Sequence, residues 1–263
     1  LDLGKIRKHN IKGSIEFKNL KFSYIEGEEV LKGINLKVRP GEKIAIVGST
    51  GSGKTTIINL LSRFYEFNHG DILIDDIPIK DFRLKNLNSN ISVVLQDVFL
   101  FADTIHNNIS LYDTKITREK IIKAAMEIGV HDFINSLPLN YDYNVKERGV
   151  MLSSGQRQLI AFLRAYMSNP SILVLDEATS SIDSYAEELI QNAIKKITIG
   201  KTSIMIAHRL TTIRNADRIA VMDKGRIVEL GNHSELIKNY SGLYFNLYNP
   251  QFSELEKTKE ISL

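Results

Sequence analysis

The segment Gly48-Ser49-Thr50-Gly51-Ser52-Gly53-Lys54-Thr55 constrains the fold of this chain more than any other feature, since it matches the pattern G-x-x-x-x-G-K-[ST]. It follows an apolar run, residues 43–47, and leads into residues 55–65, which have the spacing of an amphipathic helix. Glycines in such a segment let the backbone close around a phosphate, toward which the following helix directs its N-terminal N–H groups. The segment therefore predicts a buried strand, a phosphate-binding loop and a helix, in that order.

Further apolar runs predict an α/β core with a mostly parallel sheet. These runs are short and rich in β-branched residues or leucine: residues 91–95, 172–175 and 203–206. A helical pattern over residues 185–196 separates the last two, which is typical of parallel strands joined by a crossover helix.

Other segments alternate apolar and polar residues as the strands of an antiparallel sheet do: residues 14–24, 30–38 and 71–79. Residues 217–230 have the pattern of a hairpin that turns at Asp223-Lys224-Gly225. Two short helices, residues 234–238 and 243–248, are expected after it. The charged residues 252–263 are expected to be frayed.

Residues 97–168 have a mainly helical pattern and are expected to form a subdomain inserted in the core. Within it, Thr117-Arg118-Glu119 is typical of a capped helix start, so we expect a helix from there to Ile128, ended by Gly129. The expected fold is a P-loop NTPase core with a mostly parallel sheet, an antiparallel β subdomain and this helical insertion.

Composition argues against several classes of function. The chain is 43% hydrophobic and 25% charged, and no apolar run approaches the roughly 18 residues needed to cross a bilayer. It contains no Cys, which excludes disulfides and thiolate metal sites. A net charge of +3 with scattered basic residues does not indicate a nucleic-acid surface, so no nucleic-acid partner is expected.

Two acidic residues follow the apolar run 172–175. Asp176 is expected at the carboxyl edge of the sheet, where it would position Mg²⁺, with the hydroxyl of Thr55 as a further ligand. Glu177 would polarise a water that attacks the γ-phosphate, although alone it is also explained as an acid that stabilises the next helix. Lys54 would hold the β- and γ-phosphates.

The glycine-rich phosphate loop and the acidic end of a buried strand are shared by GTPases, helicases and kinases. A third motif distinguishes this chain from those proteins. Leu152-Ser153-Ser154-Gly155-Gln156 closely resembles the LSGGQ signature of ABC ATPases, and the resemblance extends over residues 15–248. In that family the signature contacts the γ-phosphate of ATP held by a second domain, which implies a head-to-tail dimer that closes on ATP. The same residues are also an ordinary helix N-cap, and Ser154 adds a Cβ where the family pattern has Gly.

Single residues elsewhere occupy positions that have a role in the family. Tyr24 matches the aromatic that stacks on adenine, although an aromatic at a strand end also suits core packing. Gln96 matches the glutamine that reaches Mg²⁺ and the attacking water. Asp183 belongs to a segment, residues 181–183, that matches the interface loop or simply caps a helix. His208 matches the histidine that contacts the γ-phosphate and braces Glu177, where an isolated histidine would be structural or exposed.

The resemblance thus implies ATP as substrate, Mg²⁺ as cofactor and ATP hydrolysis as activity. The implied catalytic residues are Lys54, Gln96, Glu177 and His208, and the implied metal ligands are Thr55, Gln96 and Asp176. The residues implied to contact nucleotide are Tyr24, Gly48, Ser49, Thr50, Gly51, Ser52, Gly53, Lys54, Thr55, Thr56, Ser153, Gly155, Gln156 and Asp183.

Two segments resemble the exporter branch of the family, where they touch the membrane-spanning domain: Glu147-Arg148-Gly149 and the apolar residues 98–101 that follow Gln96 and Asp97. The resemblance implies a docking surface at residues 98–101, although each of these side chains is equally well explained as filling the helical subdomain. The resemblance implies an ATPase domain over residues 13–250 at the cytoplasmic face of a membrane. Residues 1–12 would be a linker from an upstream transmembrane domain, and residues 251–263 a polar tail.

Two alternative functions stay open. The first is a soluble ABC ATPase that remodels nucleic acid or ribosomes, which would carry coiled-coil, zinc or second-cassette segments that this sequence lacks. The second is a regulatory cassette of a heterodimer, against which the presence of both Glu177 and His208 argues.

Overall fold

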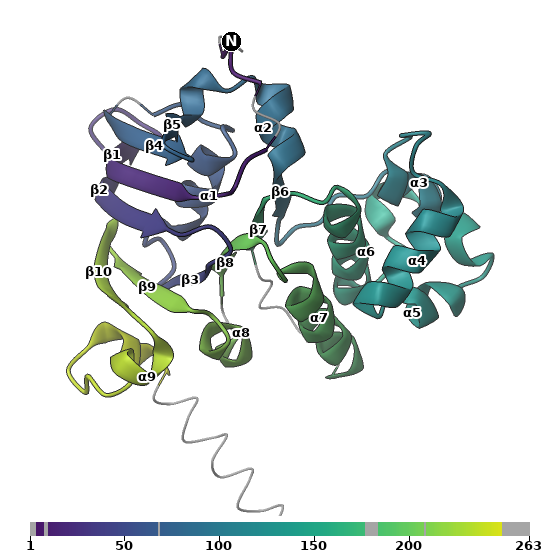
Figure 1. Cartoon of the computed structure of the whole chain (residues 1–263). Helices are drawn as coiled ribbons and strands as arrows, with labels where there is room; N and C mark the ends of the chain where they lie inside the picture. Colours follow the sequence, from purple (N-terminus) through teal and green to yellow (C-terminus); the bar gives the residue numbers. More distant parts are fainter. Residues whose placement is uncertain (1–3, 8–9, 68, 177–183, 208, 249–263) are drawn as a thin grey trace, which may run out of the picture. The chain divides into compact units, whose positions relative to one another are not determined.

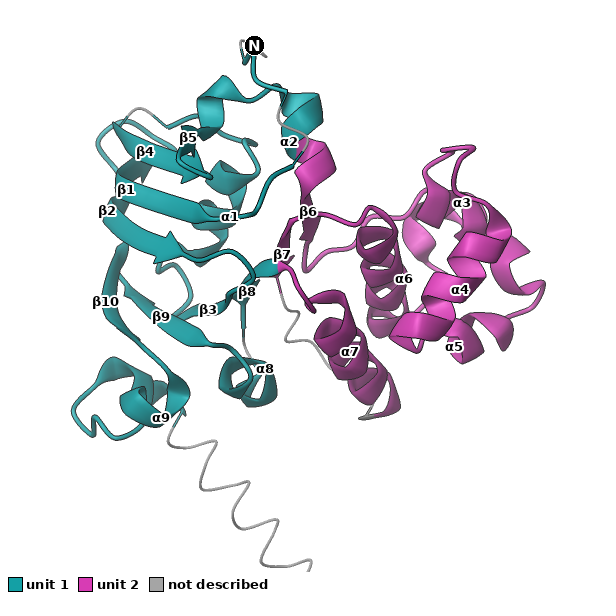
Figure 2. Cartoon of the chain, in the orientation of Figure 1, with its two compact units in different colours: residues 1–87, 202–263 teal, residues 88–201 magenta. Residues whose placement is uncertain are grey.

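The computed structural model describes residues 4–7, 10–67, 69–176, 184–207 and 209–248 of the chain. Its contacts divide the chain into two compact units, residues 1–87 with 202–263 and residues 88–201 (Figure 2). Among the described residues, no helix has the length and apolarity needed to cross a bilayer. The tail 252–263, expected to be frayed, lies outside the described residues.

An antiparallel sheet in the first unit forms from the segments with alternating polarity (Figure 1). Its strands, in spatial order, are β2 (Glu29–Val38), β1 (Ile15–Ser23), β4 (His69–Ile74) and β5 (Ile77–Pro78). The strand expected over residues 71–79 is in fact two strands, because Asp75 and Asp76 take positive φ angles of 49° and 63° and turn the chain. The Asp75 carboxylate then accepts hydrogen bonds from the N–H groups of Gly13 (3.0 Å) and Ser14 (2.9 Å).

The first unit also contains the parallel strands that carry the glycine-rich segment. The strand β3 (Lys43–Gly48) runs parallel to both β8 (Thr202–Ile206) and β9 (Arg218–Asp223). The strand β10 (Arg226–Gly231) returns antiparallel to β9, so the predicted hairpin is confirmed. Residues 44–47 of β3 are fully buried, as a parallel strand covered on both faces requires.

Helix α1 (Lys54–Leu61) begins as predicted but ends at Leu61 rather than at residue 65. Arg63 takes a left-handed φ of 53°, and its side chain is only 4% exposed. There its guanidinium donates to the carbonyl oxygen of Phe82 (3.0 Å) and to the carboxylate of Glu66 (2.8 Å). A continued helix would carry the guanidinium away from these acceptors, so satisfying a buried charge ends α1.

Short helices complete the first unit: η1 (Ile79–Asp81), the start of α2 (Leu84–Asn90), α8 (Leu210–Arg214), α9 (His233–Leu236) and residues 243–248. The two helices expected after the hairpin are therefore present, the first of them beginning and ending slightly earlier than predicted.

The second unit is mainly helical around two parallel strands, β6 (Ile91–Val94) and β7 (Ile172–Asp176). Its helices are α3 (Ile105–Ser110), α4 (Arg118–Ile128), α5 (His131–Asn135), η2 (Asn140–Asp142), η3 (Glu147–Gly149), α6 (Ser154–Met167) and α7 (Ser184–Ile197). As predicted, Thr117 caps the start of α4, and Gly129 ends it in the left-handed conformation. The boundaries 97–168 of the helical subdomain stay a prediction.

Glu42 joins the start of β3 to the start of β9. Its carboxylate accepts hydrogen bonds from the guanidinium of Arg218 and from the N–H group of Arg39. Burial raises the pKa of Glu42, but the hydrogen bonds from Arg218 and Arg39 and the charge of Arg218 outweigh it, so the pKa lies below its usual value.

Because the pKa of Glu42 is lower in the folded state, its ionised carboxylate stabilises the folded chain at neutral pH. This contribution to the free energy of unfolding is lost as the pH falls below 4.5 through the folded-state pKa. We expect Glu42→Gln to lower the free energy of unfolding by roughly 0.5–1 kcal/mol at neutral pH, measured by urea unfolding. The difference from the unsubstituted chain should shrink as the pH is lowered to about 3.5. A difference that stays constant with pH would contradict this assignment.

Candidate functional site

The phosphate loop, residues 48–55, lies in the first unit between β3 and α1. Gly48, Gly51 and Gly53 have φ angles of 148°, 80° and 102°, which side-chain-bearing residues rarely adopt. A Cβ at Gly48 would lie 2.2 Å from the carbonyl oxygen of Met222, and one at Gly53 would lie 2.8 Å from the side chain of Leu31. These close approaches require glycine, so the loop takes the closed form that its pattern predicts.

The interior of the loop contains a cation and an unsatisfied hydroxyl. The ammonium of Lys54, a buried residue, donates to the carbonyl oxygens of Gly48 (2.8 Å) and Ser49 (2.9 Å). The Ser52 Oγ is buried and has no hydrogen-bond partner among the described residues, which costs about 1–3 kcal/mol unless a ligand supplies one. Thr55 is exposed at the first turn of α1. A buried cation, an orphaned hydroxyl and a helix N-terminus in one concave loop fit a phosphate chain.

Tyr24 lies beside the loop through its contacts with α1. Its hydroxyl donates to Thr56 Oγ1 (3.3 Å) and accepts from Asn59 Nδ2 (3.1 Å). Its ring packs edge-on against Phe22, with centroids 4.8 Å apart, and against Tyr65, with centroids 5.0 Å apart. Since Tyr24 is still 45% exposed, it is not a core-packing residue, and its position beside the phosphate loop suits a planar ligand.

Asp176 and Gln96 belong to the second unit and follow neighbouring strands. Val94 of β6 is paired with Leu175 of β7, so the two parallel strands end at the same level. Asp176 is buried at the end of β7, whereas Gln96, two positions after β6, is exposed. The side-chain oxygens of both residues are of the type that Mg²⁺ binds.

Ser153 and Gln156 form a reciprocal cap at the start of α6, also in the second unit. Ser153 Oγ accepts from the N–H group of Gln156 (3.2 Å), and Gln156 Oε1 accepts from the N–H group of Ser153 (3.0 Å). Gly155 is buried in the first turn, and Ser154 is half-buried. The N-cap interpretation is thus confirmed, while the contact with nucleotide stays a prediction.

The apolar segment after Gln96 is divided between the interior and the surface. Leu100 is fully buried, so the expectation that residues 98–101 form a docking surface is wrong for this residue. Phe99 and Phe101 are 57% and 45% exposed, with their ring centroids 5.3 Å apart. Three adjacent apolar residues are indistinguishable by hydrophobicity, so the sequence alone does not separate them.

Two polar residues that the sequence analysis did not single out hold this segment. The fully buried Asn108 accepts from the N–H group of Phe101 (2.8 Å) and donates to its carbonyl oxygen (3.0 Å). Arg164 of α6 donates to the carbonyl oxygen of Asn108 (2.8 Å), and burial lowers the pKa of Arg164. The available signal was Asn108, which has the helical spacing of the apolar residues Ile105 and Ile109.

Three predicted site residues, Glu177, Asp183 and His208, lie outside the described residues. Within the described chain, the first unit brings Tyr24 and Thr56 together beside the phosphate loop. The second unit brings the ends of β6 and β7 to one level and holds Ser153 and Gln156 in contact.

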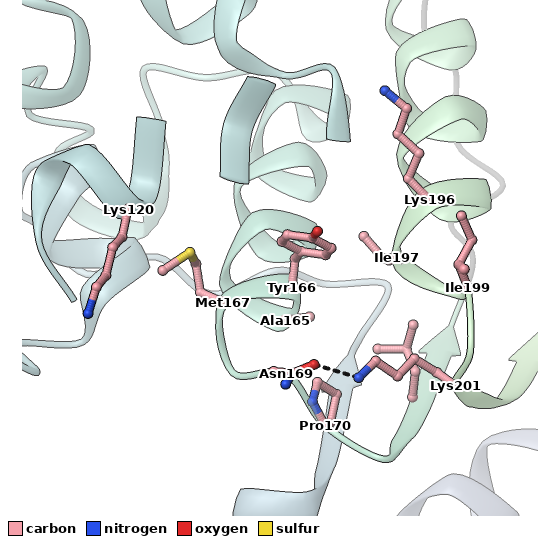
Figure 3. A pocket seen from close by; sticks show the side chains of 11 residues that line it. Lys120, Ala165, Tyr166, Met167, Asn169, Pro170, Lys196, Ile197, Ile199 and Lys201 are labelled. Atoms are coloured by element: carbon pink, nitrogen blue, oxygen red, sulfur yellow. Dashed lines mark hydrogen bonds between the residues drawn. The ribbon is translucent and has the colours of Figure 1, made fainter. Parts of the chain in front are cut away.

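A separate cavity of about 540 Å³ lies in the second unit near the C-terminal ends of α6 and α7 (Figure 3). Its lining includes Lys120, Lys196 and Lys201 among mainly apolar residues. The three ammonium groups point in different directions in Figure 3, and that of Lys201 donates to Asn169 (2.5 Å). Cations that do not converge make a poor anion site, so the phosphate loop is the stronger candidate.

Comparison with known proteins points to one family. The family model described as ABC transporter matches residues 31–180. An uncharacterized ABC transporter ATP-binding protein of Bacillus subtilis is 48% identical over 94% of this chain and 41% of its own length. A probable multidrug resistance ABC transporter ATP-binding/permease protein of the same species is 46% identical over 100% of this chain and 38% of its own length. An ATP-dependent lipid A-core flippase of Hahella chejuensis is 46% identical over 97% of this chain and 44% of its own length.

The fold is similar to that of a bacterial Atm1-family ABC exporter with ATP bound. The TM-score is 0.87 at 38% identity, covering 95% of this chain and 44% of that one. The fold class and the family resemblance predicted from the sequence are therefore confirmed. The chain spans about two fifths of the length of the relatives that it matches.

We expect Ser153→Ala to lower the free energy of unfolding by about 1 kcal/mol, because the N–H group of Gln156 loses its acceptor. Urea unfolding measures the change. Ser154→Ala is the matched control: its hydroxyl takes no part in the capping box, so the change should stay within about 0.5 kcal/mol. Equal losses in the two variants would contradict the capping role of Ser153.

Proposed function

This chain belongs to the ABC transporter family and is an ATP-binding domain of the exporter type, and on that premise we propose that it hydrolyses ATP to power transport by a larger protein. The observation that carries the proposal is the phosphate loop. Its glycines take the positive φ angles and close approaches that shape the loop, Lys54 supplies a buried cation, and Ser52 supplies a hydroxyl in need of a partner. These features fit the triphosphate of ATP.

In this proposal, residues of the first unit bind and orient ATP. N–H groups of the phosphate loop hold the phosphate oxygens, and Lys54 exchanges its two carbonyl partners for the β- and γ-phosphates. Tyr24 stacks on adenine, oriented by Thr56 and Asn59 through its hydroxyl. Positioning and charge neutralisation supply most of the catalysis in phosphoryl transfer, so these contacts also stabilise the transition state.

Hydrolysis further requires a metal ion and a base. The oxygen ligands assigned to Mg²⁺ are the hydroxyl of Thr55, the amide of Gln96 and the carboxylate of Asp176. Mg²⁺ bound with the nucleotide neutralises phosphate charge. Glu177 accepts the proton of the attacking water, and His208 contacts the γ-phosphate.

We assign two partners to the domain. A second ABC ATPase domain binds head-to-tail, its ATP contacting Ser153, Gly155, Gln156 and Asp183. The proposed anion contact is consistent with the start of α6, whose first N–H groups lack intrahelical acceptors. A transmembrane domain docks on Phe99 and Phe101, which are exposed, and the backbone of Phe101 is held by Asn108. The domain would then act at the cytoplasmic face of a membrane.

The proposal is tested by the ATPase rate of the chain as a function of its concentration with Mg²⁺, with Glu177→Gln as the blank. If two chains form each site, the rate rises faster than linearly with concentration. Glu177→Gln should bind ATP while losing at least about a hundredfold in turnover, the scale of general-base catalysis. Near-normal hydrolysis by this variant would rule out Glu177 as the base, and a linear rate in dilute solution would contradict sites shared between chains.

Substitutions of Tyr24 test the stacking contact. Tyr24→Phe keeps the ring and should bind ATP within about threefold of the unsubstituted chain, whereas Tyr24→Ala should bind it at least about tenfold more weakly. Equilibrium titration with ATP in the Glu177→Gln background measures both constants without turnover. Equal affinities for the two variants would refute stacking by Tyr24.

A further inference from the structure

The turn between β9 and β10 contacts the phosphate loop through its backbone. The N–H group of Gly225 donates to the carbonyl oxygen of Ser52 (3.1 Å). The carbonyl oxygen of Gly225 accepts from the N–H group of Lys32 on β2 (2.9 Å). One residue of the turn therefore links the phosphate loop to the antiparallel sheet of the same unit.

Only glycine fits this position of the turn. Gly225 has a φ of 81°, and a Cβ added to it would lie 2.2 Å from the carbonyl oxygen of Val30. A contact of that length with backbone is relieved only if the turn or β2 shifts. A shift of the turn would lengthen the hydrogen bond to Ser52.

The strand before the turn supports the base of the same loop. In the parallel pair of β3 and β9, Gly48 is opposite Met222, whose carbonyl oxygen would lie 2.2 Å from a Cβ at Gly48. Gly51 of the loop and Lys224 of the turn line one hollow of about 730 Å³ in the first unit. The hairpin of β9 and β10 therefore contacts the phosphate loop at both Gly48 and Ser52.

We propose that Gly225 is a positioning residue for nucleotide binding, acting through its hydrogen bond to Ser52. The proposal rests on the function proposed above, since it requires that the phosphate loop bind ATP. Without this hydrogen bond the loop samples more conformations, and the affinity for ATP falls with the fraction that is competent to bind. The N–H group of Ser52 bonds within the loop, to the carbonyl oxygen of Ser49 (3.2 Å), so holding Ser52 also holds the curvature of the loop.

Gly225→Ala tests the proposal against the matched variant Gly41→Ala. Gly41 belongs to the same unit and has a similar φ of 75°, but nothing lies within 4 Å of an added Cβ. Both variants incur the strain of a left-handed alanine, and only Gly225→Ala moves a contact of the loop. We expect the dissociation constant for the non-hydrolysable analogue AMP-PNP with Mg²⁺ to rise about tenfold in Gly225→Ala and to stay within about twofold in Gly41→Ala.

The titration is made at a temperature at which circular dichroism shows every variant folded. Lys224→Asn is a further control, because asparagine tolerates the φ of 44° found at Lys224 while removing the charge. It should bind AMP-PNP within about twofold of the unsubstituted chain. An equal loss in Lys224→Asn and Gly225→Ala would overturn a role for the backbone of the turn.

Amide hydrogen exchange of the unsubstituted chain gives a second test that needs no foldable variant. If the turn and loop are coupled, AMP-PNP should slow exchange at the Gly225 N–H group by about fivefold or more, since a held loop keeps its acceptor in place. Unchanged exchange on binding, or equal affinity of Gly225→Ala and the unsubstituted chain, would overturn the inference. Failure of the unsubstituted chain to bind nucleotide would instead refute the proposed function on which the inference rests.

Discussion

The close approach of the phosphate loop to two other strands is the constraint on which the candidate site depends. Gly48 leaves no room for a side chain against β9, and Gly53 leaves little against Leu31 of β2. These approaches fix where β3 ends and where α1 begins, and so place the Lys54 ammonium inside the loop. A methyl group at either glycine would displace backbone or packed side chains, since a close-packed interior has few alternative arrangements. The conformation of the phosphate loop therefore depends on the strands packed against it as well as on its own glycines.

Buried polar side chains hold the irregular segments around the candidate functional residues. Arg63 satisfies a carbonyl oxygen of Phe82 and thereby ends α1, and Asn108 satisfies both backbone groups of Phe101. Arg164 in turn donates to the carbonyl oxygen of Asn108 from α6, the helix that Ser153 caps and whose first turn carries Gln156. Removing such a side chain leaves buried groups unsatisfied, which costs more than the net value of the bond itself. Irregular backbone can therefore be as well fixed as a strand.

Local patterns predicted much of the fold, and distant contacts account for what they missed. The caps of α4, the hairpin turn at residues 223–225 and the phosphate loop follow from spacing and from residues that favour particular φ angles. The end of α1 depends on the partners of Arg63, and the bond between Gly225 and Ser52 joins residues far apart in the sequence. Hydrophobicity alone does not distinguish the buried Leu100 from the exposed Phe99. The role expected of Asp176 followed from its place after a buried strand, whereas the roles expected of Tyr24 and Gln96 came from family resemblance, because the chemistry of their side chains alone does not identify a ligand.

At Ser154, what the helix start requires of a residue differs from what a bound ligand would require. The family pattern has glycine there, yet the capping box between Ser153 and Gln156 is complete and α6 starts at Ser154 itself. Serine is also well suited to the start of a helix, so its extra Cβ imposes no cost on α6. If the proposed head-to-tail dimer forms, the extra Cβ of Ser154 would matter for the approach of ATP rather than for the conformation of α6. The stability of the start of α6 therefore depends on the side chains of Ser153 and Gln156, and the side chain of Ser154 takes no part in the capping box.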